Sequence, residues 1–529
     1  MQLRAHRPLI MGRRGAVASN HPVATQAGVD VLRAGGNAAD AAVAVALTLG
    51  VVEPHMSGLG GDGFYHVWDA AQRRGRVFNG TGAAPAGATA DAYRARGGIP
   101  LHGPLSVSIP AMLAGLTLMH RSCGARDWRG LFGPAIEAAR DGFAVTHHLR
   151  KFAEAQRARM PEGECAAAIF LPGGAPPSLG ALLRQEGLAA TLEALSGGAD
   201  FAALLAPGVA AAGVPVSAPD LAAMEAEELA PIAVPYRGFE VAQTPPNSTG
   251  FTLLQMLRIL DRYDLAALGW GSAALIHIMV EAKKRAFLDR EAQGGDPRGR
   301  EVPIAMLLSE ARAAEHAAAI DLTRAADLPL KPWPGSGDTT YFCVVDRSGN
   351  AVSAIQSLNS PFGSGVIAGE TGVLLNNRMS YWHLEPGHAN ELVPARRVRH
   401  TMNAPMILRD GRPWCVLGTP GADNQVQINA QAIVGLCDFG MDPQQVAEAP
   451  RWTSSQYGQP ANYPHEGDDV LTMEDGLAGA APELRAMGHR VKLVPPLEGP
   501  CSLEAIRLLD NGVRMAGSDP RRDGWAGAF

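Results

Sequence analysis

The sequence is poor in the features that mark nucleic-acid-binding, membrane or secreted proteins. Its 46 Lys and Arg residues are outnumbered by 52 Asp and Glu, and the formal net charge of -6 provides no basic surface for nucleic acid or an anionic membrane. The longest apolar run, Ala41 to Val52, is too short to span a bilayer. The first 22 residues include basic side chains but no apolar signal segment, so a cytoplasmic location is expected.

Cysteine and histidine patterns are equally uninformative about metals or disulfides. The six cysteines are widely separated and none forms a CxxC pair, which argues against a disulfide framework or a zinc cluster. His147 and His148 are adjacent in the sequence, and neighbours rarely bind one ion on a regular element. No HExxH motif or spaced carboxylate cluster is present. We therefore expect no metal and no other cofactor.

What the chain does have is length and a globular composition. It contains 529 residues, 47% of them apolar and 19% charged, enough for one very large domain or two to three smaller ones. The segment GLGGDG (58 to 63) formally fits the GxGxxG pattern of dinucleotide sites. Such a site needs a strand before the loop and a helix after it, whereas here a helix precedes and a strand follows. We interpret it as a tight turn that another backbone approaches closely.

Two kinds of segment follow one another along the chain. Helices are expected at 23–34, from the N-cap Asn37 onward, at 131–141, 181–195, 252–263 and 274–289, and again at 424–438. The stretch 327–337 holds three prolines and two glycines and is expected to be an exposed linker. After it, strands are expected at 339–346 and 351–359, paired as a hairpin, and at 372–377, 405–410 and 413–420.

The junction between linker and strand carries a pair of threonines, Thr339 and Thr340. A threonine hydroxyl is a weak nucleophile and needs a base. If the bond before the threonine is cut, its new α-amino group, with a reference pKa of about 7.7 to 8.0, can take the hydroxyl proton. One residue then supplies nucleophile and base. An ordinary strand residue with a satisfied hydroxyl is the alternative.

Several motifs resemble those of one enzyme family. They are AGGNAADAAVAVALTLGVVEP (34 to 54), GLGGDGF (58 to 64), ARDGFAV (139 to 145), PPNSTGFTLLQML (245 to 257), HIMVEAKKRAFLDR (277 to 290), TTYFCVVDRSGNAVSAIQSLN (339 to 359), GVIAGETGVLLNN (365 to 377), GTPGAD (418 to 423) and GSDPRRDG (517 to 524). In this order they resemble the landmarks of the γ-glutamyltranspeptidase family of N-terminal-nucleophile hydrolases. The resemblance covers essentially the whole chain.

The resemblance implies a fold and a two-chain organisation. The family fold is an α/β architecture, a four-layer αββα sandwich of the N-terminal-nucleophile hydrolase type. By resemblance, Thr339 is the nucleophile, with Thr340 as the runner-up, and self-cleavage falls between Asp338 and Thr339. Residues 1–338 would then form a large subunit and 339–529 a small subunit. The two cleaved chains would remain associated, and a homodimer of this unit is left open.

The resemblance also assigns supporting residues. Ser357 stands where the family has a threonine that assists the nucleophile, and Asn359 matches the family's asparagine beside it. Two residues apart on a strand, both point to one face. Gly421 matches an oxyanion-hole glycine, and Ala422 replaces the next glycine while keeping its backbone N–H. Without the family context, polar strand positions and a plain turn are the simpler interpretations.

The family's glutamyl-binding residues are missing. Thr81 stands in place of the arginine that holds the glutamyl α-carboxylate, and Tyr381 in place of the aspartate that holds the α-amino group. Arg378 lies at a second substrate-contact position, and Thr401 and Met402 replace tandem serines. An unpaired glutamyl head would cost several kcal/mol. We therefore expect hydrolysis of a different, small anionic amide, as in the oxamate amidohydrolases and cephalosporin (glutaryl) acylases of the family.

A substrate carboxylate would require a cation. Arg378 is the preferred candidate, since its family position lines the pocket. Arg396, Arg397, Arg399 and His400 also cluster there, although a solvated basic loop is the simpler interpretation of the arginines at 396 to 399. Two alternatives to the hydrolase remain: a true γ-glutamyltransferase or glutathione hydrolase with rearranged contacts, and a non-processing relative that binds ligands. No nucleic-acid or membrane partner is expected.

Overall fold

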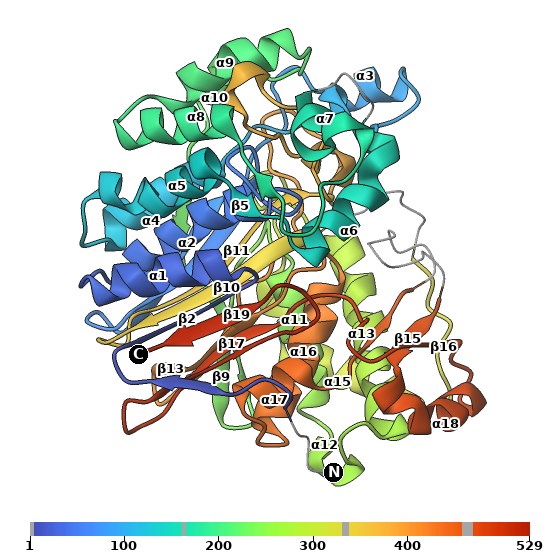
Figure 1. The fold of residues 1–529 in the computed structure, drawn as a ribbon. Helices are drawn as coiled ribbons and strands as arrows, with labels where there is room; N and C mark the ends of the chain where they lie inside the picture. The colour runs from blue at the N-terminus through green and yellow to red at the C-terminus, as the bar shows by residue number, and fades with distance from the viewer. Residues whose placement is uncertain (1–4, 161–164, 331–337, 457–468) are drawn as a thin grey trace.

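Two seven-stranded antiparallel sheets form the centre of the computed structural model, which describes residues 5–160, 165–330, 338–456 and 469–529 (Figure 1). The first, here the Thr339 sheet, has the order β19 (Trp525–Ala528), β2 (Gly15–Ser19), β10 (Asp338–Asp346), β11 (Ala351–Asn359), β3 (Asp62–Asp69), β4 (Arg74–Gly80), β7 (Glu227–Leu229). The second, here the β13 sheet, has the order β1 (Ile10–Gly12), β18 (Arg514–Ser518), β17 (Glu504–Leu508), β13 (Arg412–Gly418), β12 (Met406–Arg409), β9 (Phe239–Gln243), β8 (Ile232–Tyr236).

Helices cover the outer face of each sheet (Figure 1). Against the Thr339 sheet lie α1 (Pro22–Arg33), α2 (Ala38–Val52) and α4 (Met112–Cys123), backed by α5 (Gly133–Asp141) and α8 (Glu186–Ser196). Against the β13 sheet lie α11 (Gly250–Leu260), α16 (Asn424–Cys437) and α17 (Pro443–Glu448), and α13 (Ala273–Gln293) packs on α11. The result is a four-layer αββα sandwich, as the resemblance implies.

Shorter elements complete the chain. The remaining α-helices are α3 (Ala90–Arg94), α6 (His147–Gln156), α7 (Cys165–Phe170), α9 (Phe201–Ala211), α10 (Ala218–Ala222), α12 (Leu265–Leu268), α14 (Ile304–Leu307), α15 (Glu310–Ala318) and α18 (Ala481–Ala486). Two small sheets join β14 (Trp452–Ser454), β15 (Leu471–Glu474) and β16 (Val491–Val494), and β5 (Phe143–Ala144) with β6 (Leu182–Leu183).

Three apolar cores hold the layers together. Between the sheets lies a core that includes Phe64, Tyr341 and Met406, all fully buried. A second core joins the Thr339 sheet to its helices, and a third joins the β13 sheet to α11, α13 and α16. Because both faces of β10 and β11 are covered, all their residues are buried. This explains why these strands read as nearly continuous apolar runs.

The helix α2 shows how local sequence fixes an element. Asn37 accepts a hydrogen bond from the Asp40 N–H, and the Asp40 carboxylate accepts one from the Asn37 N–H, so the two form a capping box as the sequence predicts. Nearly every residue of α2 is buried, which its apolar surface all round also predicts. The helix ends next to Glu53, so it delivers that carboxylate to the start of β10.

The turn GLGGDG connects α2 to β3, and the expectation of a close backbone approach is confirmed. A Cβ atom on Gly60 would lie 2.1 Å from the Leu374 carbonyl oxygen, and one on Gly61 would lie 2.3 Å from the Ser357 carbonyl oxygen. Only glycine fits against these two backbones. The turn therefore supports the end of β11, where Ser357 lies.

Several sequence expectations need correction. Residues 372–377 form no strand; they make isolated bridges, such as the one between Leu375 and Gly60. Here buried asparagine side chains replace the ladder, for example Asn376, which donates to the Gly60 carbonyl oxygen at 2.8 Å. The helix expected at 181–195 begins only at Glu186, after the short strand β6. Of the expected linker 327–337, residues 331–337 lie outside the described part of the chain.

Strands from both sides of residue 338 are interleaved. In the Thr339 sheet, β10 lies between β2 and β11, and β11 pairs with β3. In the β13 sheet, β12 pairs with β9. A cut before Thr339 would therefore leave two chains that share both sheets.

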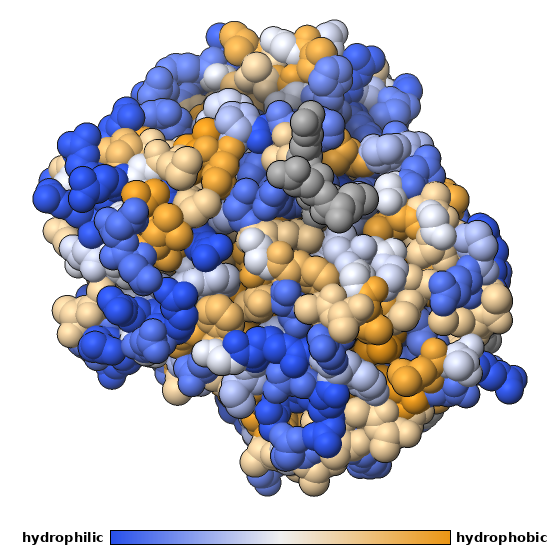
Figure 2. Space-filling view, turned by 90° about the horizontal axis from the view of Figure 1, so that it is seen from below, coloured by the Kyte–Doolittle hydropathy of each residue, from blue (hydrophilic) through white to orange (hydrophobic). Residues whose placement is uncertain are grey.

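The surface mixes polar and apolar residues. On the face shown in Figure 2, hydrophilic residues are interspersed with apolar ones. Large exposed apolar side chains, such as those of Trp525 and Leu182, come from separate parts of the chain. None of the helices that the structure describes has both the length and the apolar character needed to cross a membrane.

Candidate active site

Thr339 lies at the start of β10, where the pairing with β11 is irregular. Asp338 pairs with Asn359, but the register shifts between Asp338 and Thr340, so Thr339 occupies a bulge. Bulges redirect side chains and are frequent beside active sites. The Thr339 side chain is buried, with its Oγ 3.5 Å from the Ser357 Oγ and 3.5 Å from the Gln425 Nε2.

Ser357 connects the candidate nucleophile to the bond expected to be cut. Its hydroxyl donates a hydrogen bond of 2.5 Å to the carbonyl oxygen of Asp338 and accepts one of 2.7 Å from the N–H of Asn359. The carbonyl that precedes Thr339 is therefore polarised by a donor on the neighbouring strand. The sequence predicted a supporting role for Ser357, and the geometry gives that role a specific atom to act on.

Thr340, the runner-up, has its hydroxyl engaged elsewhere. It donates to the Glu53 carboxylate at 2.6 Å and accepts from the Asn20 Nδ2 at 3.1 Å. Burial raises the pKa of Glu53 to about 8, although the hydrogen bond from Thr340 opposes this rise. With donor and acceptor sides both used, the Thr340 hydroxyl is poorly placed to attack. The contacts favour Thr339 over Thr340.

Gly421 and Ala422 form the turn between β13 and α16. Both have positive φ angles, 115° for Gly421 and 47° for Ala422. In the part of the chain that the structure describes, neither backbone N–H donates a hydrogen bond. Gln425, in the first turn of α16, reaches the Thr339 Oγ, so this turn lies beside the nucleophile. Two buried, unused N–H donors there suit an oxyanion hole.

Arg378 is buried against the end of β11, at Asn359. Its Nε lies 3.2 Å from the Asp62 carboxylate, and its Nη1 donates to the Asn359 side chain at 3.1 Å. Its Nη2 is buried without a hydrogen-bond acceptor among the described residues. The guanidinium lies 5.2 Å from the ring centre of Tyr381. One ion pair is thus already made, and one donor atom remains.

Tyr381 lies beside two of the other predicted substrate contacts, Arg378 and Thr401. Burial raises its pKa well above the usual value, and its hydroxyl shares a hydrogen bond with Thr401. The Asp423 carboxylate also raises the pKa of Tyr381, whereas the guanidinium groups of Arg378 and Arg290 oppose the rise. Arg290 and Asp423 form a buried ion pair of their own. The sequence interpretation gave no role to Asp423 or Arg290, although both lie inside motifs that it quoted.

Thr81 belongs to a different hydrogen-bond network. Its hydroxyl donates to the Asn79 side chain at 2.7 Å and accepts from Asn247 at 3.2 Å, and its carbonyl oxygen accepts from Arg397. These contacts do not connect it to Thr339. A role for Thr81 in substrate binding stays a prediction.

The interpretation of residues 396 to 399 as a solvated basic loop is wrong for two of the three arginines. Arg397 and Arg399 are 2% and 3% exposed. Arg397 donates to the Glu225 carbonyl oxygen at 2.6 Å, and Arg399 lies 3.0 Å from the Glu291 carboxylate. Both support the fold around the site. A run of arginines does not reveal which acids and carbonyls lie nearby in space.

A cleft of about 510 Å³ has Arg522, Cys501 and Phe152 among its lining residues, and Arg522 connects its wall to Asp338 and Thr339. The Arg522 Nη2 lies 3.0 and 2.9 Å from the two carboxylate oxygens of Asp338, and its Nη1 donates to the Thr339 carbonyl oxygen at 3.4 Å. Burial raises the pKa of Asp338, while the Arg522 guanidinium opposes that rise. Arg522 lies in the motif GSDPRRDG, but the sequence alone predicts no role for it.

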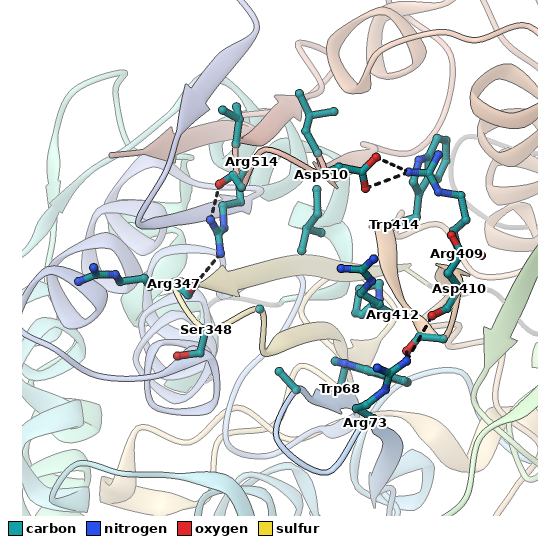
Figure 3. Close-up of a pocket in the computed structure, with 18 residues that line it drawn as sticks. Trp68, Arg73, Arg347, Ser348, Arg409, Asp410, Arg412, Trp414, Asp510 and Arg514 are labelled. Carbon is teal, nitrogen blue, oxygen red and sulfur yellow. Dashed lines mark hydrogen bonds and ion pairs between the residues drawn. The ribbon is translucent and has the colours of Figure 1, made fainter.

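A second cavity has a volume of about 330 Å³, and Figure 3 shows the residues that line it. Trp68 and Trp414 line it, and five arginines contribute to its wall: Arg73, Arg347, Arg409, Arg412 and Arg514. It is formed at the turns that follow β3, β10, β12 and β17. Since Thr339 lies at the start of β10, this cavity is separated from it by the length of that strand and is not part of the candidate active site.

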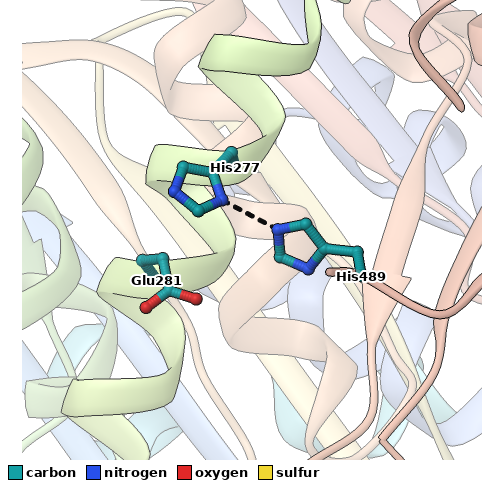
Figure 4. A group of neighbouring side chains, drawn as sticks. All are labelled: His277, Glu281 and His489. Atoms are coloured by element: carbon teal, nitrogen blue, oxygen red, sulfur yellow. Dashed lines mark hydrogen bonds between the residues drawn. The ribbon is translucent and has the colours of Figure 1, made fainter. Parts of the chain in front are cut away.

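One histidine–carboxylate group has metal-ligand residue types (Figure 4). His277 and His489 share a hydrogen bond of 2.8 Å, and the His277 Nε2 lies 2.7 Å from the Asp321 carbonyl oxygen. Glu281 is paired with Arg285 at 2.7 Å. Because the ring nitrogens and the carboxylate already bind one another or a cation, this group is better suited to holding the chain near Asp321 on α13 than to binding an ion.

A second such group consists of Glu291, His383 and His388. The two rings are stacked with centroids 3.7 Å apart, and each has its Nε2 within 3.4 Å of the Glu291 carboxylate. Arg399 binds the same carboxylate. A permanent cation already neutralises the only acid of the group, which makes it a poor site for a metal ion.

Known proteins resemble this chain over its whole length. The sequence profile described as Gamma-glutamyltranspeptidase matches residues 24–529. The glutathione hydrolase-like YwrD proenzyme of Bacillus subtilis is 35% identical, covering 98% of this chain and 99% of its own length. The oxamate amidohydrolase proenzyme of Klebsiella pneumoniae subsp. pneumoniae is 33% identical, covering 97% and 98% respectively.

A solved structure also resembles this chain over its whole length. The crystal structure of cephalosporin acylase from Bacillus halodurans matches with a TM-score of 0.90 at 30% identity, covering 100% of this chain and 98% of that chain. The predicted family and fold are confirmed. The relatives are hydrolases and acylases, several of them named as proenzymes. The chain is an enzyme and belongs to the gamma-glutamyltranspeptidase family.

Proposed function

We propose that the chain is a proenzyme that cuts itself between Asp338 and Thr339 and then hydrolyses a small anionic amide with Thr339 as its N-terminal nucleophile. Residues 1–338 would form the large subunit and 339–529 the small one. The observation that carries the proposal is the placement of the Ser357 hydroxyl, 2.5 Å from the Asp338 carbonyl oxygen and 3.5 Å from the Thr339 Oγ. A nucleophile, a carbonyl and a donor for its oxygen lie together.

This geometry supports the following steps of self-cleavage. The Thr339 Oγ attacks the Asp338 carbonyl carbon while Ser357 stabilises the negative charge that develops on the carbonyl oxygen. The C–N bond then breaks, the hydroxyl proton ends on the Thr339 nitrogen, and an ester joins Asp338 to the Thr339 Oγ. Water hydrolyses the ester. The products are a carboxylate on Asp338, a free Thr339 hydroxyl and a free α-amino group.

Turnover uses the groups that cleavage produces. The α-amino group of Thr339 accepts the hydroxyl proton as the Oγ attacks a substrate amide. The N–H groups of Gly421 and Ala422 stabilise the tetrahedral oxyanion, and Gln425 and Ser357 position the Oγ. The amine leaves with the proton. Water then hydrolyses the acyl-enzyme and regenerates Thr339.

A small anionic amide is the substrate class that the residues favour. Thr81 cannot supply the charge of the arginine that binds a glutamyl carboxylate in the family, and its hydroxyl is bonded to Asn79 and Asn247. Two similar proteins are named for reactions on other substrates, an oxamate amidohydrolase and a cephalosporin acylase. Two arginines lie near the nucleophile: Arg522 donates to the Thr339 carbonyl oxygen, and Arg378 donates to the side chain of Asn359.

Hydrolysis of a γ-glutamyl amide is the second candidate, and one observation favours it. In the described structure, Arg378 has a buried Nη2 and Asp423 a buried Oδ2, neither with a hydrogen-bond partner. Both groups flank Tyr381. A cation and an anion in this arrangement could receive a zwitterionic head. One similar protein is named a glutathione hydrolase-like proenzyme.

Intact mass analysis and an amide panel test the proposal. The wild-type chain should yield two fragments whose masses place the break between Asp338 and Thr339, and Thr339→Ala should stay uncut. The cut enzyme should hydrolyse oxamate or a glutaryl anilide faster than a γ-glutamyl anilide given with a dipeptide acceptor. An uncut wild-type chain after prolonged incubation would instead support a ligand-binding relative. Faster γ-glutamyl transfer would support the second candidate.

A further inference from the structure

We infer that Arg522 binds the anionic end of the substrate's acyl group, and that this acyl group has the succinyl skeleton, a four-carbon dicarboxylic acid joined to the amide through one carboxyl. The inference deepens the proposed function and rests on self-cleavage at Asp338–Thr339. It identifies a specificity residue that differs from Arg378.

The Asp338 side chain occupies Arg522 before cleavage. One guanidinium nitrogen lies 3.0 and 2.9 Å from the two carboxylate oxygens. Both side chains are buried, with exposures of 8% for Arg522 and 0% for Asp338. The same guanidinium reaches the Thr339 carbonyl oxygen. Arg522 therefore binds a carboxylate right next to the carbonyl that the nucleophile attacks.

The intermediate of self-cleavage is chemically an acyl-enzyme. When the Thr339 Oγ has displaced its own nitrogen, the Asp338 carbonyl carbon is bound to the Oγ as an ester, the same bond that a substrate acyl group forms during turnover. From that carbon, Asp338 continues through Cα and Cβ to its carboxylate carbon. This is a succinyl chain with an amino substituent. The first acyl group that the site hydrolyses thus carries its anion at the Arg522 position.

Cleavage removes the carboxylate that Arg522 holds. Once the ester is hydrolysed, Asp338 is a chain end and no longer tethered to Thr339. Two further acids of the described structure have partners of their own: Glu53, which acts on Arg522, accepts from Thr340 at 2.6 Å, and the neighbouring Asp523 lies 3.0 Å from the ring of His148. A buried guanidinium without an anion is unfavourable. The mature cleft is therefore charged to select an anionic acyl group.

Arg378 does not change in this way. Its partner Asp62 lies in β3 opposite Ser357, and breaking the Asp338–Thr339 bond detaches neither residue of this ion pair, whose atoms are 3.2 Å apart. Arg522 also lines the 510 Å³ cleft together with Phe152, over whose ring it lies at 5.6 Å. A substrate can reach this wall from the cleft, and the aromatic ring can pack against its methylene groups.

The test is a series of half-anilides with the cut wild-type enzyme. The acyl groups are oxalyl, malonyl, succinyl and glutaryl, and butyryl is the uncharged control of succinyl length. We expect kcat/KM to peak at succinyl, by about 10-fold over malonyl and glutaryl. Succinyl should exceed butyryl by on the order of 100-fold, because the uncharged analogue leaves Arg522 unpaired. Free succinate should inhibit competitively and more strongly than malonate or glutarate.

Two variants assign the effect to a residue. In Arg522→Gln the ratio of succinyl to butyryl hydrolysis should fall by about 100-fold, whereas in Arg378→Gln, the matched control, the ratio should change by less than about 5-fold. The ratio is insensitive to a general loss of activity. If Arg522→Gln is not cut, the wild-type series and the succinate inhibition decide the question without it.

The outcomes separate this inference from the function on which it rests. A cut wild-type enzyme that prefers another chain length, or shows no preference for charged acyl groups, would overturn the role of Arg522. So would a charge preference lost in Arg378→Gln and kept in Arg522→Gln. An uncut wild-type chain, or a cut chain that hydrolyses none of the anilides, would refute the proposed function, and the inference with it.

Discussion

Replacing Ser357 with alanine should slow self-cleavage strongly. The substitution removes the hydroxyl that donates to the Asp338 carbonyl oxygen at 2.5 Å and lies 3.5 Å from the attacking Oγ. It also leaves the N–H of Asn359 without its acceptor at 2.7 Å. The developing negative charge on the Asp338 carbonyl oxygen would therefore lose the Ser357 hydroxyl as its direct donor.

The size of the effect follows from these two contacts. Loss of one donor to an oxyanion costs about 2.7 to 4 kcal/mol of barrier, which is a slowing of about 10²- to 10³-fold. The unpaired Asn359 N–H is buried, and such a group lowers the free energy of unfolding by about 1 to 3 kcal/mol. A chain of this size tolerates that loss, so the variant should still fold.

The assay follows the uncut chain over time on a denaturing gel, after purification under conditions that slow cleavage. Urea unfolding measures the stability change separately. Ser357→Thr is the matched control, since it keeps the hydroxyl and introduces the residue of the family; its cleavage rate should stay within about 10-fold of wild type, with packing strain of about 1 to 3 kcal/mol in stability. Cleavage of Ser357→Ala at more than about a third of the wild-type rate would refute the proposed role.

Three further predictions concern the residues around the nucleophile. Thr339→Val should abolish cleavage, whereas Thr340→Val should still be cut and should lose about 1 to 3 kcal/mol of stability in urea unfolding, because its hydroxyl binds a buried carboxylate; the reverse pattern on the gel would make Thr340 the nucleophile. Burial raises the pKa of Glu53 from 4.5 to about 8, so the folded state holds the proton more tightly and the free energy of unfolding should fall as pH rises through that window. Glu53→Gln should remove up to about 1.4 kcal/mol per pH unit of this dependence, and equal slopes for variant and wild type would contradict the burial argument. Gly421→Ala should lose activity and stability, because the new Cβ would lie 2.2 Å from a neighbouring sulfur and the backbone has a φ of 115°. Ala422→Gly should keep its activity in an amide assay and its stability in urea unfolding. An active Gly421→Ala would argue against that turn as the oxyanion site.

Local signals in the sequence predicted much of the fold. The capping pair at Asn37 and Asp40 predicted where α2 begins, and the apolar runs on either side of residues 347–350 predicted the β10–β11 hairpin. The strand predicted at residues 372–377 is wrong, because the β-branched and apolar residues there are buried by tertiary contacts and not by pairing in a β-ladder. Their asparagines form hydrogen bonds to distant backbones, which no local pattern reveals.

The candidate active site could be predicted only in part from the sequence. The resemblance pointed to Thr339 and Ser357, which the structure brings together, and these roles stay predictions until cleavage is measured. The ion-pair partner of each charged side chain could not be predicted from the sequence. The sequence cannot show that Arg522 contacts Asp338, 184 positions earlier, or that Arg397 is buried, because such contacts depend on how distant parts of the chain fold together.

The interleaving of strands has a consequence for what a cut would do to the molecule. Because β10 lies between β2 and β11, and β12 pairs with β9, breaking the bond before Thr339 frees only the pairing of Asp338 with Asn359 and leaves the other cross-strand pairs in place. The uncut precursor can refold as a single molecule. The cut enzyme, once denatured, consists of two separate chains that must associate again in solution. Its recovery of activity should therefore depend on protein concentration. Maturation would then turn a reversible folding equilibrium into a nearly one-way step.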